Sequence, residues 1–387
     1  MSEYFQKTNV NIRKALIKIA QLNITGETTV ATVASFNIEY IQYLSPTGEL
    51  VGDEVPAIAK DFDLIKSMYE TMVLTRVFDT KAILLQRTGK LGTYASSLGH
   101  EAVHVGIGSA MRYEDVFAPM YREYGAQFCR GVKMSEVLLY WGGDERGSDF
   151  SGPPHDFPWC VPIATQNTHA AGAAMAFKLR KEPRCAVTVI GDGGSSKGDF
   201  LEAINAASAF TLPMVLVIVN NGWAISVPRK KQSSGETLAQ KGIAGGLPSI
   251  QVDGNDLLAV HAEINKALER ARNGGGATVI EAITYRLGDH TTADDASRYR
   301  PTKEVDDAKQ LEPISRIRQY LMNNNQWSVQ QENQLLEQCA LKVEAAVKTY
   351  QSTPKPAVTD MFDYMFSELP HDLKEQRKYA EELENNG

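Results

Sequence analysis

The stretch from Ala186 to Ser226 constrains the fold of this 387-residue chain more than any other segment. It reads AVTVIGDGGSSKGDFLEAINAASAFTLPMVLVIVNNGWAIS. The pattern predicts a buried strand, a Gly-Asp-Gly turn, a helix, a second buried strand and an Asn-Asn-Gly turn. Continuous apolar strands are typical of parallel sheets, and parallel strands place their following turns at one edge of the sheet, where open α/β folds bind ligands.

The residues of these two turns suit a magnesium-bound diphosphate. Glycine lets backbone N–H groups approach an anion closely. Asp192 and Asn221 offer hard oxygen ligands of the kind that Mg²⁺ takes alongside phosphate oxygens. Either turn alone could be no more than a tight turn. A carboxylate and an amide that follow two neighbouring strands together favour a ligand site.

Two other phosphate-binding motifs do not match. A dinucleotide fingerprint needs glycine at position 196, where the chain has Ser196, and an acidic residue further on, where the segment 211–219 is TLPMVLVIV. A Walker loop needs serine or threonine after its lysine, but Lys197 is followed by Gly198. The sequence therefore argues against nicotinamide dinucleotides and against a P-loop.

Further strands extend the sheet on either side of this unit. Apolar runs at 116–119, 249–252 and 278–285 alternate with helical patterns such as 101–111 and 257–272. This order predicts the α/β class, with a doubly wound, mostly parallel sheet and helices on both faces.

The ends of the chain lack this alternation, so we divide it into an N-terminal arm (1–60), an α/β domain (61–325) and a C-terminal helical extension (326–387). In the arm, Phe36, Ile38 and Tyr40 alternate with polar residues, which predicts a short strand or hairpin outside the main sheet. The last residues, KYAEELENNG, are expected to be frayed.

Composition excludes several classes of protein. The net charge of -7 leaves no basic footprint for nucleic acid. No apolar run approaches the roughly 20 residues of a membrane helix. The four cysteines form no C-x-x-C pair, which argues against a zinc or redox motif and favours reduced thiols. The N-terminus lacks the apolar core of a secretory signal. We expect a cytoplasmic protein that binds neither nucleic acid nor membrane.

Isolated polar residues outside the two turns are ambiguous. Arg122 directly follows the strand at 116–119 and could hold a phosphate, or could form a surface ion pair with Glu123 or Asp115. His290 stands in a charged loop without periodicity, and most histidines in such loops have no catalytic role.

Several motifs together resemble a known family. GDGG, GDF and NNGWAIS resemble a thiamine diphosphate motif, and the wider resemblance is to the alpha subunit of the decarboxylating component of 2-oxoacid dehydrogenases. The supporting segments include YREYG (121–125), IATQ (163–166) and YRLGDHTTADDASRYR (285–300). The resemblance covers roughly residues 60–380 and is greatest to bacterial pyruvate dehydrogenase alpha chains; branched-chain 2-oxoacid and acetoin dehydrogenases are the alternatives.

The resemblance implies a thiamine diphosphate-binding fold, with thiamine diphosphate and Mg²⁺ as cofactors, and it implies roles for individual residues. Asp192 and Asn221 would ligate the metal by side chain and Trp223, where the family usually has tyrosine, by its carbonyl, so that this substitution should cost little. His290 would act at the reacting centre as a proton donor, for which an ordinary histidine pKa is suitable. The remaining cofactor-binding residues would be Tyr121, Arg122, Val161, Ile163, Gly191, Gly193 and Gly194.

The resemblance also implies partners. The family places the glutamate that activates the aminopyrimidine on a separate beta subunit, usually in a heterotetramer of two alpha and two beta chains. The acceptor of the acyl group would be the lipoyl domain of a dihydrolipoyl acyltransferase, and the substrate a 2-oxo acid. The small-residue helix at 168–177 would help to close the shared site. A non-catalytic, cofactor-binding subunit is the rival hypothesis from another class.

Overall fold

The computed structural model describes residues 32–386, which fall into two compact units, Met1–Ile38 and Glu39–Gly387. Most of the predicted arm, residues 1–31, lies outside the described residues. Within the first unit, residues 32–38 have no regular secondary structure. Among the described residues, the sheet and all of the helices belong to the second unit.

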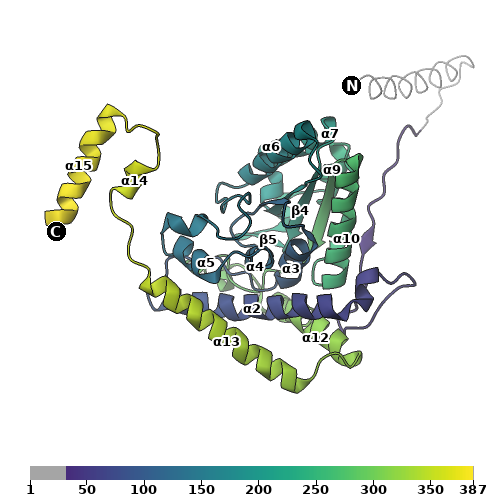
Figure 1. Cartoon of the computed structure of the whole chain (residues 1–387). Coiled ribbons are helices and arrows are strands. Elements are labelled where there is room, and N and C mark those ends of the chain that lie inside the picture. Colours follow the sequence, from purple (N-terminus) through teal and green to yellow (C-terminus); the bar gives the residue numbers. More distant parts are fainter. Residues whose placement is uncertain (1–31, 387) are drawn as a thin grey trace, which may run out of the picture. The chain divides into compact units, whose positions relative to one another are not determined.

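A six-stranded parallel sheet forms the centre of the second unit (Figure 1). The strand order is β1-β7-β8-β4-β3-β2, and β3 pairs directly with β4, as predicted. The strands are β1 (Tyr40–Ile41), β2 (Val116–Ala118), β3 (Ala186–Gly191), β4 (Met214–Asn220), β7 (Ser249–Asp253) and β8 (Thr278–Ile283). Two short antiparallel strands, β5 (Trp223–Ala224) and β6 (Val227–Pro228), lie outside the sheet. The α/β class and the parallel sheet are confirmed.

The expectation that the arm's strand lies outside the main sheet is wrong. Strand β1 pairs with β7 in parallel, with Tyr40 opposite Gln251. The backbone N–H groups of Tyr43 and Leu44 both donate to Asp256, at 2.6 and 2.7 Å. These partners stand more than 200 residues away in sequence, so the local pattern carried no sign of them.

Helices cover both faces of the sheet because alternate strand residues point to opposite sides. On one face, Leu216 and Ile218 of β4 pack with α6 (Thr165–Arg180) and α7 (Gly198–Ala209). On the other, Val215 and Val217 pack with α3 (Glu101–Ala110) and α10 (Leu257–Arg270). The doubly wound arrangement is therefore confirmed.

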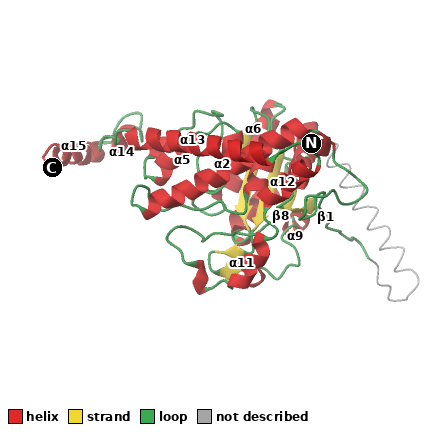
Figure 2. Cartoon of the chain, turned by 90° about the horizontal axis from the view of Figure 1, so that it is seen from below, coloured by secondary structure: helices red, strands yellow, loops and turns green. Residues whose placement is uncertain are grey.

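An outer layer of helices encloses α3. Its longest members are α2 (Phe62–Arg87), whose N-terminus is capped by the Asp61 side chain, and α13 (Val329–Ser352). Figure 2 shows these two helices side by side, with α12 (Pro313–Asn323) next to α2. The other α-helices are α4 (Tyr124–Cys129), α5 (Met134–Trp141), α8 (Arg229–Gln232), α9 (Gln240–Ala244), α11 (Thr302–Lys309), α14 (Asp360–Asp363) and α15 (His371–Asn386).

The C-terminal residues expected to be frayed form helix α15. Ion pairs one helical turn apart, such as Arg377 with Glu381 at 3.5 Å, support this helix locally. No helix in the described part of the chain is long and apolar enough to cross a membrane.

Candidate active site

A cavity of about 480 Å³ opens at the edge of the sheet where β3 and β4 end. It brings together every predicted site residue except Val161, which is 51% exposed and lies outside the lining. The predicted residues that line it are Tyr121, Arg122, Ile163, Gly191, Asp192, Gly193, Gly194, Asn221, Trp223 and His290. The topology thus assembles residues from five separate parts of the chain.

The Gly-Asp-Gly turn has no room for larger side chains at two positions. A Cβ on Gly193 would lie 2.4 Å from the Cβ of Ala224. A Cβ on Gly194 would lie 2.6 Å from Ile190 Cγ1 and 3.0 Å from Ile163 Cγ2. Glycine is required here by close packing, and the absence of a side chain lets a ligand approach the backbone closely.

Asp192 is buried, at 2% exposure, and its Oδ2 has no hydrogen-bond partner. Burial raises the pKa of this carboxyl to about 6, although the Gly193 N–H and the charge of Arg286 oppose the shift. An unpartnered buried carboxylate is costly unless a cation or a donor joins it. Its surroundings therefore fit a hard metal ion.

Asn221 and Trp223 follow β4 beside this carboxylate and are both buried. The Asn221 side-chain oxygen accepts from the Trp223 N–H at 3.2 Å, which orients the amide. The Trp223 carbonyl lies 3.4 Å from Arg286 Nη1. The turn thus supplies an amide oxygen and a carbonyl oxygen near a buried carboxylate.

Arg122 forms neither of the ion pairs considered from the sequence. Its guanidinium donates to the Ser96 carbonyl and, at 3.0 Å, to the His290 carbonyl. Arg122 forms no ion pair with a carboxylate of the described residues, and its side chain, at 4% exposure, lines the cavity beside Tyr121. An anion in the cavity would find a buried guanidinium that is free of a direct ion pair.

Arg286 is a site residue that the sequence reasoning missed. It lines the cavity, is 1% exposed and donates to the Ile225 carbonyl at 2.9 Å and to the Tyr299 hydroxyl at 3.0 Å. The sequence could have pointed to Arg286, because it directly follows the apolar run 278–285. Arg122 was considered for the same reason. Met120, Lys197, Ile225 and Gln232 also line the cavity and were not predicted.

His290 lies between two guanidinium groups. Its Nδ1 is 3.3 Å from Arg122 Nη2 and 3.4 Å from Arg286 Nη1. Guanidinium only donates, so Nδ1 must accept and the ring proton sits on Nε2. Burial, followed by these two positive charges, lowers the pKa of His290 to about 4. The expectation of an ordinary histidine pKa is therefore wrong for the ligand-free protein.

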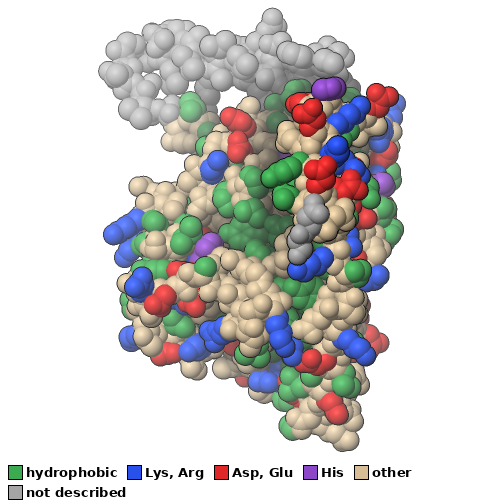
Figure 3. All heavy atoms as spheres, turned by 90° about the vertical axis from the view of Figure 1, so that its left-hand side faces the viewer, with side chains coloured by type: hydrophobic (Ala, Val, Ile, Leu, Met, Phe, Trp, Pro, Cys, Tyr) green, Lys and Arg blue, Asp and Glu red, His purple; other side chains and the backbone are tan. Residues whose placement is uncertain are grey.

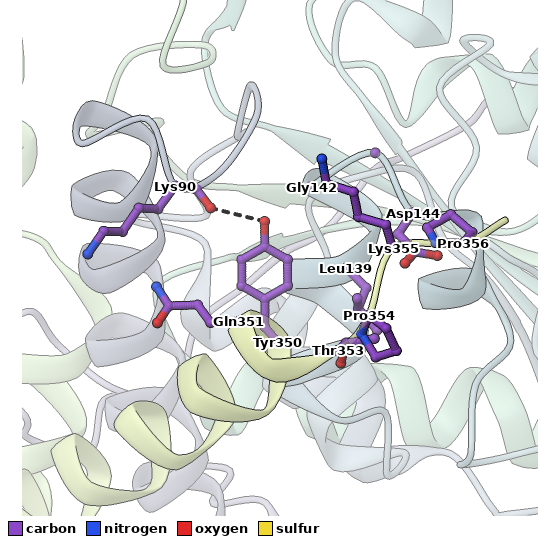
Figure 4. Close-up of a pocket in the computed structure, with 11 residues that line it drawn as sticks. Lys90, Leu139, Gly142, Asp144, Tyr350, Gln351, Thr353, Pro354, Lys355 and Pro356 are labelled. Carbon is purple, nitrogen blue, oxygen red and sulfur yellow. Dashed lines mark hydrogen bonds between the residues drawn. The ribbon is translucent and has the colours of Figure 1, made fainter. Parts of the chain in front are cut away.

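A second hollow of about 690 Å³ lies at the end of α13 (Figure 4). The Tyr350 hydroxyl donates to the Lys90 carbonyl at 3.0 Å across it. Its one carboxylate, Asp144, is already paired with Arg146. The only carboxylate among the described residues of this hollow is paired, whereas an unpartnered buried carboxylate and a histidine line the cavity at the sheet edge, so we take the latter as the candidate active site.

The residues 69–359 match the family model described as dehydrogenase E1 component. The chain belongs to this family. Membership implies thiamine diphosphate as the cofactor.

Two E1 relatives are named as pyruvate dehydrogenase E1 component subunit alpha. The one from Acholeplasma laidlawii is 42% identical over 341 residues, which cover 86% of this chain and 98% of the relative. The one from Staphylococcus aureus is 39% identical over 348 residues, which cover 90% and 94%. This E1 chain therefore matches these relatives over nearly their whole length.

Proposed function

We propose that this chain is the alpha subunit of a pyruvate dehydrogenase E1 component, which decarboxylates pyruvate and passes the acetyl group to a lipoyl group of a dihydrolipoyl acyltransferase. The observation that carries the proposal is the near full-length similarity to alpha subunits of that name. The cavity supports it, because the cavity joins an anion-binding arginine, an unpartnered carboxylate and a neutral histidine.

In this proposal the chain's own residues bind and orient the cofactor. When bound, thiamine diphosphate supplies the carbanion and the electron sink for loss of CO₂. The N–H groups of Gly193 and Gly194, with Arg122 and Tyr121, hold the diphosphate, while Ile163 supports the bent shape of the cofactor. His290 offers its Nε2 proton to oxygen atoms at the reacting centre. A diphosphate near Arg122 offsets one of the charges that lower the His290 pKa.

We further propose Mg²⁺ as the metal. Its ligands are Asp192, Asn221 and the Trp223 carbonyl, together with diphosphate oxygens. One carboxylate and two neutral oxygens suit Mg²⁺, which usually keeps only one or two protein carboxylates. Among residues 32–386, no cluster of three His, Cys, Asp or Glu side chains could hold a metal, so a carboxylate-rich or cysteine site is not an alternative there.

The partners complete the proposal. We propose that a beta subunit supplies the acid next to the aminopyrimidine, most simply in a heterotetramer of two alpha and two beta chains. We also propose that the complex is cytoplasmic. Exposed apolar side chains support the proposal that this chain binds a partner subunit. Figure 3 shows hydrophobic groups gathered at the surface of the face on the left of Figure 1. The exposed large apolar residues of the C-terminal extension are Val329, Leu336, Leu341, Met361, Tyr364, Met365, Phe366, Tyr379 and Leu383. Such residues commonly mark interfaces.

Reconstitution tests the proposal. The chain, purified alone and together with its beta chain, is assayed for decarboxylation of pyruvate and branched-chain 2-oxo acids and for cleavage of acetoin. We expect activity only with the beta chain, and highest kcat/KM for pyruvate. Strong activity of the chain alone would contradict the shared site, and a preference for a branched-chain acid would replace pyruvate as the substrate.

Replacing His290 by alanine tests its catalytic role. We expect kcat of the reconstituted complex to fall by about 100-fold or more, the range for removal of a general acid. The affinity for thiamine diphosphate, measured by titration calorimetry, should change much less, because His290 only borders the phosphate-binding groups. Unchanged turnover would favour the rival hypothesis of a purely cofactor-binding subunit.

A further inference from the structure

The carboxylate of Glu304 joins three segments that are far apart in sequence. One oxygen, Oε1, accepts from the Trp223 indole Nε1 at 2.7 Å and from the Tyr285 hydroxyl at 2.9 Å. Trp223 belongs to the turn after β4, Tyr285 follows β8, and Glu304 lies on α11. Helix α11 is the first helix after the loop 286–301, which carries His290.

The two bonds can run in only one direction. The indole Nε1 is a donor only. Burial, and then the hydrogen bond to Glu304, raises the pKa of Tyr285 to about 12, so its hydroxyl keeps its proton. Glu304 therefore accepts both bonds. Hydrogen bonds to a charged acceptor are roughly twice as strong as neutral ones.

Trp223 is held from both ends of the His290 loop. At the start of the loop, Arg286 Nη1 lies 3.4 Å from the Trp223 carbonyl. At its end, Glu304 holds the Trp223 ring, which is 7% exposed and lies 5.5 Å from the ring of Tyr299. The Tyr299 hydroxyl in turn donates to Asp294.

This network reaches His290 through Arg286, whose Nη1 lies 3.4 Å from His290 Nδ1, and through Asp294. Asp294, which accepts a hydrogen bond from the Tyr299 hydroxyl, also accepts one from the His290 backbone N–H at 2.9 Å. The Trp223 side chain thus has a structural role that the sequence did not reveal. It links the cofactor turn to the loop and to α11.

We propose that Glu304 is a positioning residue for the E1 reaction. By holding Trp223 and Tyr285 with one oxygen, it fixes the end of the 286–301 loop on the cofactor turn, so that cofactor binding and ordering of the His290 loop depend on each other. This inference rests on the proposed function of the same site. Glu304 touches neither the cavity nor the reacting atoms, and it acts through Trp223.

The test uses Glu304→Ala and Glu304→Gln in the alpha–beta complex. For Glu304→Ala we expect about tenfold weaker binding of thiamine diphosphate and about tenfold lower kcat, the effect of losing a charge-assisted hydrogen bond, with KM for pyruvate nearly unchanged. Trypsin should cleave the loop after Arg298, whose side chain is 82% exposed, about tenfold faster even at saturating cofactor. Glu304→Gln keeps an acceptor oxygen and should remain within about threefold of the wild type on each readout.

A matched control lies on the same helix. Asp307→Asn removes only the exposed pair with Lys303 and should behave as the wild type. Trp223→Phe combined with Glu304→Ala should weaken cofactor binding no more than Glu304→Ala alone, because Glu304→Ala already removes the bond to the indole. Additive effects, or a lower Tm in Glu304→Ala with unchanged cofactor affinity and cleavage rate, would overturn the proposal.

The outcomes separate the two hypotheses. If the wild-type complex decarboxylates no 2-oxo acid, the proposed function is wrong. The rate at which trypsin cleaves the loop of the ligand-free protein still tests the positioning role of Glu304. Faster loop cleavage in Glu304→Ala than in Glu304→Gln supports the positioning role, and equal rates contradict it.

Discussion

Replacing Asp192 by asparagine should stabilise the ligand-free protein and remove its response to cofactor. The Asp192 pKa is about 6 in the folded chain, against 3.8 in the unfolded one, so the folded state holds the proton more tightly. Between these pH values stability falls as pH rises, and above pH 6 the ionised carboxylate costs about 3 kcal/mol at most. Asparagine carries no charge and avoids this cost.

The same substitution should damage function severely. We expect thiamine diphosphate and Mg²⁺ to raise the Tm of the wild type but not that of Asp192→Asn, and turnover to fall by at least about 100-fold because a proposed metal ligand is lost. Thermal unfolding with and without the two ligands measures both effects. Asp63→Asn, at a fully exposed carboxylate on α2, is the control. An equal ligand-induced Tm shift in Asp192→Asn would show that the carboxylate does not bind the metal.

Replacing Asp79 by alanine should destabilise the protein by about 3 kcal/mol or more, because several buried donors lose their acceptor. Asp79, at 1% exposure on α2, accepts from the Tyr94 hydroxyl at 2.9 Å and from the Ser97 N–H at 2.7 Å. It also accepts from the Ser96 hydroxyl at 2.6 Å. Ser96 is the residue whose carbonyl receives the Arg122 guanidinium, so we also expect about tenfold weaker binding of the cofactor.

Asp79→Asn is the matched variant. The Tyr94 and Ser97 donors all meet Oδ1, and Oδ2 faces only the Ser96 hydroxyl, which can rotate to accept. An asparagine with its oxygen at the Oδ1 position keeps most of the network, so we expect a loss below about 1 kcal/mol. Thermal unfolding and cofactor titration distinguish the variants. An equal loss of stability in Asp79→Ala and Asp79→Asn would mean that the charge of Asp79, and not its acceptor oxygen, holds the segment 94–97 in place.

Local sequence patterns predicted the sheet well because buried parallel strands are short apolar runs followed by glycine-rich turns. Ile190 and Ile218 pair as expected of adjacent parallel strands, and the cavity lies where these strands end. The pattern failed at β1. Two residues, Tyr40 and Ile41, form that strand, and its position depends on β7 and on Asp256, far away in sequence.

The candidate site divides in the same way. Gly193 and Asp192 could be selected from sequence because the required geometry is local to one turn. Val161 could not be excluded, because only the path of the loop before α6 decides which residues reach the cavity. Arg286 went unnoticed because its partners come from other segments.

The sequence by itself determined the order of strands and helices along the chain and the residues of the two turns, since these depend on periodicity and on glycine geometry over a few neighbours. Only the tertiary structure decided the protonation states of the site residues. It placed His290 between Arg122 and Arg286, which sets its tautomer and lowers its pKa, and it left Asp192 Oδ2 buried without a partner. Protonation depends on burial and on charges within a few ångströms, and those distances exist only once distant segments have met.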